Sequence, residues 1–241
     1  MMRLIACLAS GVLAVAAFAA PVPKDDKLPP PTAKELNTSR NNLLQIGLAG
    51  HMYHDTRGQM PQDIVDANGK PLLSWRVLLL PYLEQDELFM QFKLDEAWDS
   101  DHNKTLIEKL PKVYAPVRVK AEKGHTFYRG FNGGDAASRP VFEPGQKLII
   151  TGIRDGLSIT VWVVEAAEST VWTKPGDLPF DPKKDLPKLG GLFEGEFHVL
   201  MCDGSVRRAK KDFDALTFKW MITRAGGEVI ADEGVFGKPK K

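Results

Sequence analysis

The sequence has few cysteines and almost no excess charge. Two cysteines in 241 residues cannot build a disulfide framework. The 32 basic residues nearly balance the 31 acidic residues, so the chain has no strong field that would attract nucleic acid or anionic lipid. We therefore expect no nucleic-acid partner.

The common catalytic and nucleotide-binding motifs are also missing. The chain has no Gly-x-Ser-x-Gly, no His-Glu-x-x-His, no phosphate loop ending in Gly-Lys-Ser/Thr and no Gly-x-Gly-x-x-Gly. Their absence favours a protein that is not an enzyme and that has no cofactor.

The composition suits one globular domain. Hydrophobic residues make up 43% of the chain and charged residues 26%, which is close to the average for soluble proteins. The length allows one ordinary domain. We place this domain at residues 32–232 and expect a flexible basic tail at residues 233–241.

The chain begins with a segment typical of a secretory signal. Arg3 precedes an apolar run that ends in Ala17-Phe18-Ala19, and small residues at these positions suit cleavage after Ala19. The run is shorter than the roughly 20 residues that span a bilayer, which argues against a permanent anchor. Cys7 lies too early for the lipidated cysteine of a lipoprotein. We therefore expect export to the periplasm, cell envelope or exterior, cleavage of residues 1–19, and no stable membrane span afterwards.

The next segment reads as a tether. Residues 20–31 contain five prolines with scattered charges, which favours an extended, semi-rigid linker. Once the signal is removed, Cys202 is the remaining cysteine. An exposed thiol is a liability in an oxidising compartment, so we expect Cys202 to be buried in a strand.

The first half of the domain favours helices. Thr32 and Glu35 form a capping box, and apolar residues then recur at helical spacing as far as Arg57-Gly58, which predicts the longest helix of the chain. Residues 66–70 predict a tight turn. Ser74 can cap a helix over residues 75–80, which Pro81 should end or kink. A further short helix is expected at residues 102–110.

The second half favours short strands. They are rich in β-branched or aromatic residues and bounded by turn formers, and we place them at residues 113–120, 125–131, 147–151, 160–165, 197–202 and 205–208. Asp203-Gly204 predicts a hairpin, hence an antiparallel sheet. A last helix is expected at residues 212–224, stopped by Gly226-Gly227. Helices followed by strands indicate an α+β fold.

Residues 174–195 form a long loop that is rich in proline and glycine. The segment is too long for an ordinary connection in a compact domain. Such loops often carry a binding site, and a stabilising lid over the sheet is the alternative. The sequence leaves both interpretations open.

Six stretches of the chain resemble a known family. They are residues 41–48 (NNLLQIGL), 51–55 (HMYHD), 71–85 (PLLSWRVLLLPYLEQ), 92–100 (FKLDEAWDS), 172–175 (WTKP) and 203–206 (DGSV). Together they resemble the bacterial domain of unknown function 1559 family, which is expanded in planctomycetes and looks like type IV pilins and pseudopilins. The resemblance implies a pilin-like fold, with a long N-terminal helix packed on an antiparallel sheet. It implies no known activity.

The chain departs from the family pattern in two places. Typical members begin with a prepilin-like segment and a long apolar helix, whereas this chain has a secretory signal and a proline linker. Assembly into a pilus is therefore not expected. Members also often carry a histidine ten residues before the aspartate of the final Asp-Gly, where this chain has Phe193.

Several groups of residues could carry chemistry. His51, His54 and Asp55 could offer metal ligands from one helix, but this spacing without a further ligand favours packing or exposure instead. His198 lies near Cys202 and Asp203, yet Cys202 is four positions further along the expected strand than His198. At roughly 3.3 Å per residue this is too far for a hydrogen bond, so no nucleophile and base pair is expected.

Acidic and aromatic residues are weaker candidates. Asp177, Asp181 and Asp185 could bind calcium, but lysines interleave with them and no twelve-residue calcium loop is present. Five aromatic residues could form a platform for sugars or peptides, although core packing is favoured: Trp75, Tyr82, Trp98, Trp162 and Trp172. The basic patch at residues 207–211 is typical of a solvated strand end.

The sequence therefore predicts an exported, non-catalytic, pilin-like module that contacts protein or cell-envelope partners. We assign no catalytic residue and no metal ligand, and the ligand-binding residues stay unknown. The alternative is a secreted protein that binds a small ligand or a glycan. A metal-dependent hydrolase is less favoured than either.

Overall fold

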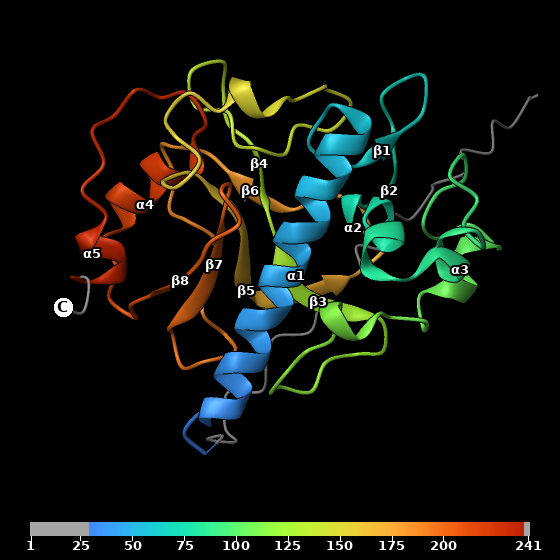
Figure 1. Cartoon of the computed structure of the whole chain (residues 1–241), viewed down its shortest axis with the longest axis horizontal. Helices are drawn as coiled ribbons and strands as arrows, with labels where there is room; N and C mark the ends of the chain where they lie inside the picture. Colours follow the sequence, from blue (N-terminus) through green and yellow to red (C-terminus); the bar gives the residue numbers. More distant parts are fainter. Residues whose placement is uncertain (1–28, 239–241) are drawn as a thin grey trace, which may run out of the picture.

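A computed structural model describes residues 29–238 of the chain. The expected signal peptide, residues 1–19, lies outside the described residues, as does most of the expected linker, residues 20–31. The described part contains one long helix and a four-stranded sheet, with shorter helices and strands around them (Figure 1). This arrangement confirms the expected α+β class.

The long helix α1 (Ala33–Arg57) begins and ends where the sequence predicts. The Glu35 N–H donates to the Thr32 hydroxyl at 3.2 Å, and the Thr32 N–H donates to the Glu35 carboxylate at 2.7 Å. This capping box satisfies two amide groups at the start of the helix. At the other end Gly58 has a φ of 66°, a left-handed cap that glycine adopts at little cost.

The main sheet has four antiparallel strands, in the spatial order β3 (His125–Arg129), β5 (Val161–Val171), β7 (Phe197–Met201) and β8 (Val206–Ala209). The turn from β7 to β8 confirms the predicted hairpin. In this turn Gly204 has a φ of 83°, and the Asp203 carboxylate accepts a hydrogen bond from the Ser205 N–H at 2.8 Å.

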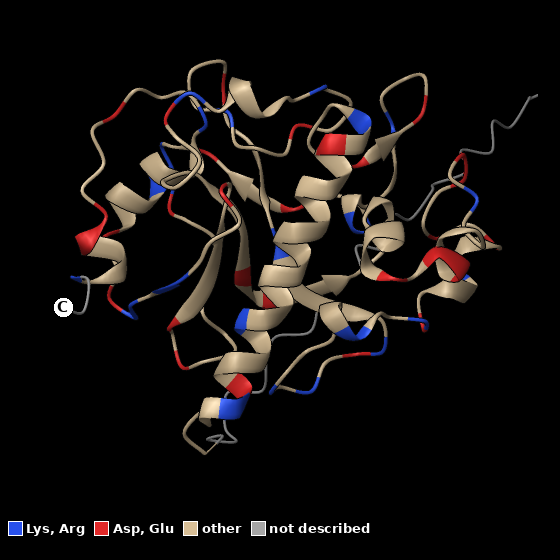
Figure 2. Cartoon of the chain, in the orientation of Figure 1, with Lys and Arg blue, Asp and Glu red and all other residues tan. Residues whose placement is uncertain are grey.

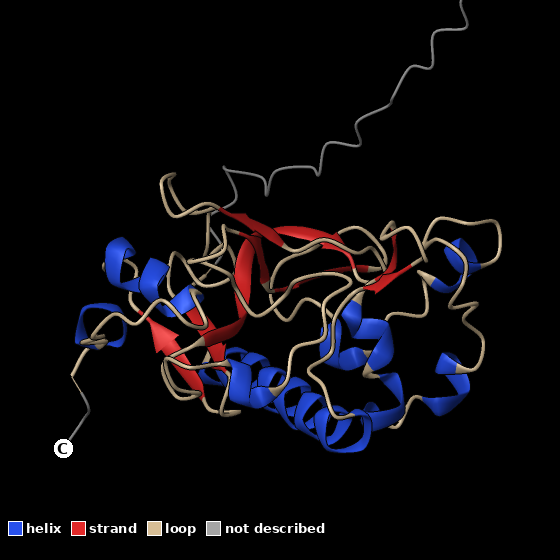
Figure 3. Cartoon of the chain, turned by 90° about the horizontal axis from the view of Figure 1, so that it is seen from above, coloured by secondary structure: helices blue, strands red, loops and turns tan. Residues whose placement is uncertain are grey.

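Helix α1 lies along one face of this sheet (Figures 1 and 3). Side chains alternate between the two faces along β7. One set packs with the aromatic residues of α4 (Ala215–Ile222): Phe197, Val199 and Met201. The other set, His198 and Leu200, faces α1. The sheet thus separates two apolar clusters, and β7 places the polar side chain of His198 on the face beneath α1.

Shorter elements surround the sheet. In the first half these are β1 (Ile64–Val65), β2 (Pro71–Leu73), α2 (Trp75–Leu78), α3 (Asp86–Phe89) and three 3-10 turns at Leu80–Leu83, Asn103–Leu106 and Lys112–Tyr114. In the second half they are β4 (Phe131–Gly133), a 3-10 turn at Ile150–Gly152, β6 (Leu178–Phe180) and α5 (Glu233–Phe236). The Ser74 hydroxyl caps α2 as predicted, accepting from the Arg76 N–H at 3.3 Å.

Two predicted strands are wrong. Residues 113–120 contain the end of a 3-10 turn and no strand. Pro116 lies within this stretch and has no amide hydrogen to offer a neighbouring strand. Residues 147–151 also form no strand, because the backbone turns there and the Gly152 N–H donates to the Ile149 carbonyl at 2.9 Å. Both segments have the apolar, β-branched composition of a strand. Neither has a neighbouring strand to pair with among residues 29–238, so neither forms one.

Three predicted helices are shorter than expected. The helix expected at residues 75–80 ends at Leu78, before Pro81, and the helix expected at residues 102–110 is a 3-10 turn that ends at Leu106. The last helix, expected at residues 212–224, covers Ala215–Ile222. The Asp214 carboxylate accepts from the Leu216 N–H at 3.1 Å and so defines its start.

The long loop at residues 174–195 is packed against the domain. Its strand β6 pairs in parallel with β4, outside the main sheet. Leu192 and Phe193 are buried and form an apolar cluster with Phe127 of β3. These contacts agree with the lid interpretation.

The large aromatic residues belong mainly to the core. Trp75, Trp162 and Trp172 are at most 1% exposed, so they cannot form a surface platform. Tyr82 and Trp98 are partly buried against the same cluster. The structure therefore supports the interpretation of these residues as core packing.

Candidate functional site

A buried glutamate and a buried histidine on neighbouring strands form the centre of the candidate site. Glu165 on β5 is fully buried, and His198 on β7 is 4% exposed. The Nδ1 atom of His198 lies 3.2 Å from both carboxylate oxygens of Glu165, and the His198 N–H donates to Glu165 Oε2 at 2.6 Å. Because an ionised carboxylate only accepts hydrogen bonds, this geometry places a hydrogen on Nδ1.

Three residues extend this pair into a chain of hydrogen bonds beneath α1. The Ser39 hydroxyl donates to Glu165 Oε1 and lies 2.8 Å from the Tyr128 hydroxyl, which accepts from the Asn42 side-chain amide at 3.2 Å. Since Ser39 gives its hydrogen to the carboxylate, Tyr128 must donate to Ser39. Burial is the main cause that raises the pKa of Tyr128, and the negative charge of Glu165 raises it further. The phenol therefore keeps its proton.

This order of groups does not make an activated nucleophile. In a serine hydrolase the serine hydroxyl donates to the histidine, which takes up its proton. Here Ser39 is bound to Glu165 and not to His198. The chain of bonds therefore fixes α1 to the sheet and orients the imidazole.

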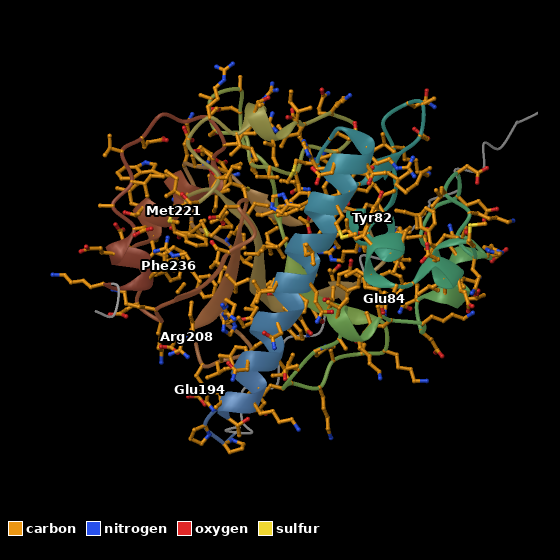
Figure 4. All side chains as sticks on the ribbon, viewed as in Figure 1. Tyr82, Glu84, Glu194, Arg208, Met221 and Phe236 are labelled. Atoms are coloured by element: carbon orange, nitrogen blue, oxygen red, sulfur yellow. The ribbon has the colours of Figure 1, made fainter. Side chains whose placement is uncertain are left out.

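His198 also lines a surface pocket of about 300 Å³ between the first turns of α1 and strand β8. Asn37 and Arg40 of α1 and Arg208 of β8 contribute polar groups to this pocket. Figure 4 shows Arg208 beside the lower turns of α1. Phe193 packs edge-on against the imidazole, with ring centroids 5.6 Å apart. Of the buried pair Glu165 and His198, the histidine therefore borders a surface pocket.

A second polar cluster is built around Arg76. The buried guanidinium donates through Nη2 to Asp177 at 2.9 Å, through Nε and Nη2 to the Tyr128 carbonyl at 3.0 and 2.6 Å, and through Nη1 to Ser74 at 2.6 Å. The other Asp177 oxygen accepts from the Trp75 indole N–H at 2.8 Å. These groups satisfy one another, which identifies the cluster as a structural link between α2, β3 and the long loop.

Asp63 lies next to this cluster. Its two carboxylate oxygens accept from the Trp75 N–H at 2.9 Å and from the Gly176 N–H at 2.8 Å. Burial, and then the nearby charge of Asp177, raises the pKa of Asp63 to about 6. Asp63 and Gln62 also border a pocket of about 390 Å³. Both oxygens are engaged by backbone amides, so Asp63 joins two loops of the fold.

Comparison with known proteins identifies the family. A family model described as SBP_bac_10, Protein of unknown function (DUF1559), matches residues 36–187, which is more than half of the chain. The chain belongs to this family. No curated protein and no solved structure matches the chain. The match confirms the resemblance carried by the sequence motifs, and the family description assigns no activity.

The histidines of α1 are held separately in this DUF1559 member. The His51 ring packs edge-on against Trp162, with centroids 5.7 Å apart. His54 Nε2 accepts from the Ile150 N–H at 3.4 Å, while its Nδ1 lies 3.6 Å from the Asp55 carboxylate. Across residues 29–238, no group of three or more His, Cys, Asp or Glu side chains is placed to hold a metal ion.

Sequence reasoning named His198 and missed its partner. Cys202 is fully buried, as expected, although it lies in the turn directly after β7 and not within the strand. Burial raises the pKa of its thiol. The residue that contacts His198 is Glu165, on the neighbouring strand. One signal could have indicated it: Glu165 interrupts an apolar run from Val161 to Ala166, where an acid needs a buried partner.

The acidic residues of the long loop do not converge on one point. Asp177 is buried on Arg76, whereas Asp181 accepts from the Lys183 N–H at 3.0 Å and pairs with Lys184 at 3.2 Å. Asp185 is exposed. The regular spacing of these three residues therefore reflects different local roles.

The basic patch at residues 207–211 is partly neutralised. Arg207 pairs with Asp232, and its guanidinium lies 3.9 Å from the ring centroid of Phe236. Arg208 lies 3.3 Å from Glu196. These contacts agree with the interpretation of the patch as a solvated strand end.

Proposed function

We propose that this DUF1559 member is an exported, non-catalytic module that acts by contacting another protein of the cell envelope. The polar groups beneath α1 support a non-catalytic role, because Ser39 and Glu165 are held by each other and by the backbone. The description of the DUF1559 family names no enzymatic activity.

One observation carries the proposal: the middle of α1 has no charge on its outward side. From Asn41 to His54 the helix contains no Asp, Glu, Lys or Arg. Figure 2 shows charged residues near the two ends of α1 and none between them. Within this stretch Leu48 is 63% exposed and Met52 is 44% exposed, and the two are one helical turn apart.

This face has the character of an interface core. The solvent face of a helix on a monomeric domain is ordinarily polar and charged. Charged residues are depleted where two proteins meet, and methionine is enriched there. Leu44, partly buried and four residues before Leu48, continues the apolar stripe. We therefore propose a partner protein that presents an uncharged, apolar surface to this stripe of Leu44, Leu48 and Met52.

Export rests on the N-terminal sequence. Among the helices of residues 29–238, none combines the length and apolar character that crossing a membrane requires. Mass spectrometry of the native protein tests the proposed export, with Ala20 expected as the first residue. A cytosolic pool that retains Met1 would contradict it.

A photo-crosslinking amino acid at position 48, placed in the protein in its own cells, tests the contact. The control is the same amino acid at Leu216 of α4, which is 56% exposed and thus matches Leu48 in chemistry and exposure. We expect a discrete product with one other protein from position 48 and not from position 216. A product of two copies of this chain, or equal products from both positions, would contradict the proposal.

A further inference from the structure

The pocket at the start of α1 has the construction of a binding site. It lies between α1 and β8, with apolar walls from Leu36 and Val206 and polar groups from Asn37, Arg40 and Arg208. Its volume of about 300 Å³ is at the lower end of small-molecule sites. At this end of α1 the capping box already engages the N–H groups of Thr32 and Glu35.

A buried imidazole lines this pocket, with one nitrogen outside its bonds to Glu165. His198 is 4% exposed and lines the pocket, and Glu165 holds its Nδ1. Within residues 29–238, the hydrogen bonds of His198 to Glu165 use its backbone N–H and Nδ1, and Nε2 takes no part in them. With the hydrogen on Nδ1, Nε2 is an acceptor, so it calls for a ligand that donates an N–H or O–H. Phe193 and Glu165 together fix the direction of the ring.

The charges of the pocket favour a single negative charge. Arg208 lies 3.3 Å from Glu196 and is only partly balanced by it. With its one hydrogen on Nδ1, the imidazole of His198 is neutral and does not balance the charge of Glu165 behind it. Arg40 is exposed and has no ion-pair partner among the described residues. The guanidinium of Arg40 attracts an anion, while the charge of Glu165 behind the neutral imidazole opposes a second negative charge, so a carboxylate is favoured over a doubly charged phosphate.

We propose that this pocket binds a small aliphatic monocarboxylate that carries an N–H or O–H beside the carboxylate. Arg40 and Arg208 pair with the carboxylate, and Asn37 adds an amide donor at the rim. The neighbouring N–H or O–H donates to Nε2 of His198. The short aliphatic part lies against Leu36 and Val206. A free acyl amino acid and the C-terminal residue of a peptide share this chemistry.

The binding test uses three matched probes and isothermal titration calorimetry on the purified protein. N-acetyl-L-valine carries both features, its methyl ester lacks the charge, and 3-methylbutanoate lacks the N–H. We expect N-acetyl-L-valine to bind about tenfold more tightly than either of the others, since each loses a buried or charged hydrogen bond. Equal affinities, or tighter binding of inorganic phosphate, would overturn the proposal.

Variants locate the binding on the protein. Arg40 is exposed, so the substitution Arg40→Gln should not unfold the chain. We expect it to lower the affinity for N-acetyl-L-valine by about tenfold. Arg207→Gln is the control, since Arg207 is next to Arg208 in the sequence but contacts Asp232 and Phe236. Unchanged binding in Arg40→Gln, or an equal loss in Arg207→Gln, would exclude this pocket.

A further arm distinguishes the two sources of the carboxylate. The peptide Gly-Gly-Val extends the acyl group of N-acetyl-L-valine along a peptide backbone. Tighter binding of the peptide would identify a peptide C-terminus, whereas weaker binding would identify a free small acid. The proposal is independent of the partner contact at Leu48, which lies about two turns beyond Arg40 along α1.

Discussion

Gly50 of α1 lies directly against the indole of Trp162. A Cβ atom added at position 50 would come within 2.1 Å of Cη2 of this ring, far closer than any van der Waals contact. Glycine is a poor helix former, costing about 1 kcal/mol relative to alanine. Its presence here is therefore explained by the close approach of α1 to the sheet.

Gly50→Ala should accordingly destabilise the protein. Overpacking against Trp162 outweighs the gain in helix propensity, and we expect a net loss of about 1–3 kcal/mol in the free energy of unfolding. Urea unfolding followed by tryptophan fluorescence measures it. The exposed Asn41→Ala on the same helix serves as the control and should change stability by less than about 0.5 kcal/mol. Equal stability of the two variants would disprove the steric explanation.

Glu165→Ala should be among the more damaging single substitutions of the sheet. It removes the acceptor for the Ser39 hydroxyl, the His198 N–H and the His198 imidazole, and leaves these buried donors unpaired. The expected cost is about 2–4 kcal/mol in unfolding free energy. Glu168→Ala, on the exposed part of the same strand, is the matched control. If both variants unfold at the same urea concentration, the hydrogen-bond chain does not stabilise the fold.

Asp63 should make the protein less stable as the pH rises through about 6. Its pKa is raised from 3.8 to about 6 in the folded protein, so the folded state holds this proton more tightly than the unfolded chain. The stability linked to this proton is present below about pH 4 and is lost as the pH rises through 6. It amounts to at most about 3 kcal/mol.

The difference between wild type and Asp63→Asn isolates this effect. Unfolding free energies measured from pH 4 to pH 7 contain contributions from other carboxylates and histidines, and subtraction removes those that the two proteins share. We expect wild type to lose stability relative to Asp63→Asn as the pH rises. A difference that is flat, or that slopes the other way, would show that Asp63 is ionised throughout.

Cys202 should be chemically silent until the protein unfolds. The thiol is fully buried, and burial raises its pKa, so both access and the thiolate form are lacking. In a Cys7→Ser background, a thiol reagent should label the native protein slowly and the urea-unfolded protein at once. Rapid labelling of the native protein would show that the turn after β7 opens readily.

The candidate site shows where sequence reasoning stopped. The sequence indicates His198 as a candidate, with Cys202 and Asp203 nearby in the chain. Glu165 was missed because it is 33 positions away from His198. The pairing depends on the register between β5 and β7, where Val164 lies opposite Val199. The ion pair of Arg76 and Asp177 could not be predicted from the sequence for the same reason, since 101 positions separate the two residues.

The sequence by itself determined the features that depend on a few neighbouring residues. The capping box at Thr32, the left-handed cap at Gly58 and the hairpin at Asp203-Gly204 each require only residues within about four positions, so their chemistry is legible in the chain. Tertiary structure alone decided which apolar runs became strands, because a strand needs a partner. The tertiary structure also brought Glu165 to His198 beneath α1. A buried carboxylate is costly unless hydrogen-bond donors surround it, and these donors come from residues far away in the sequence.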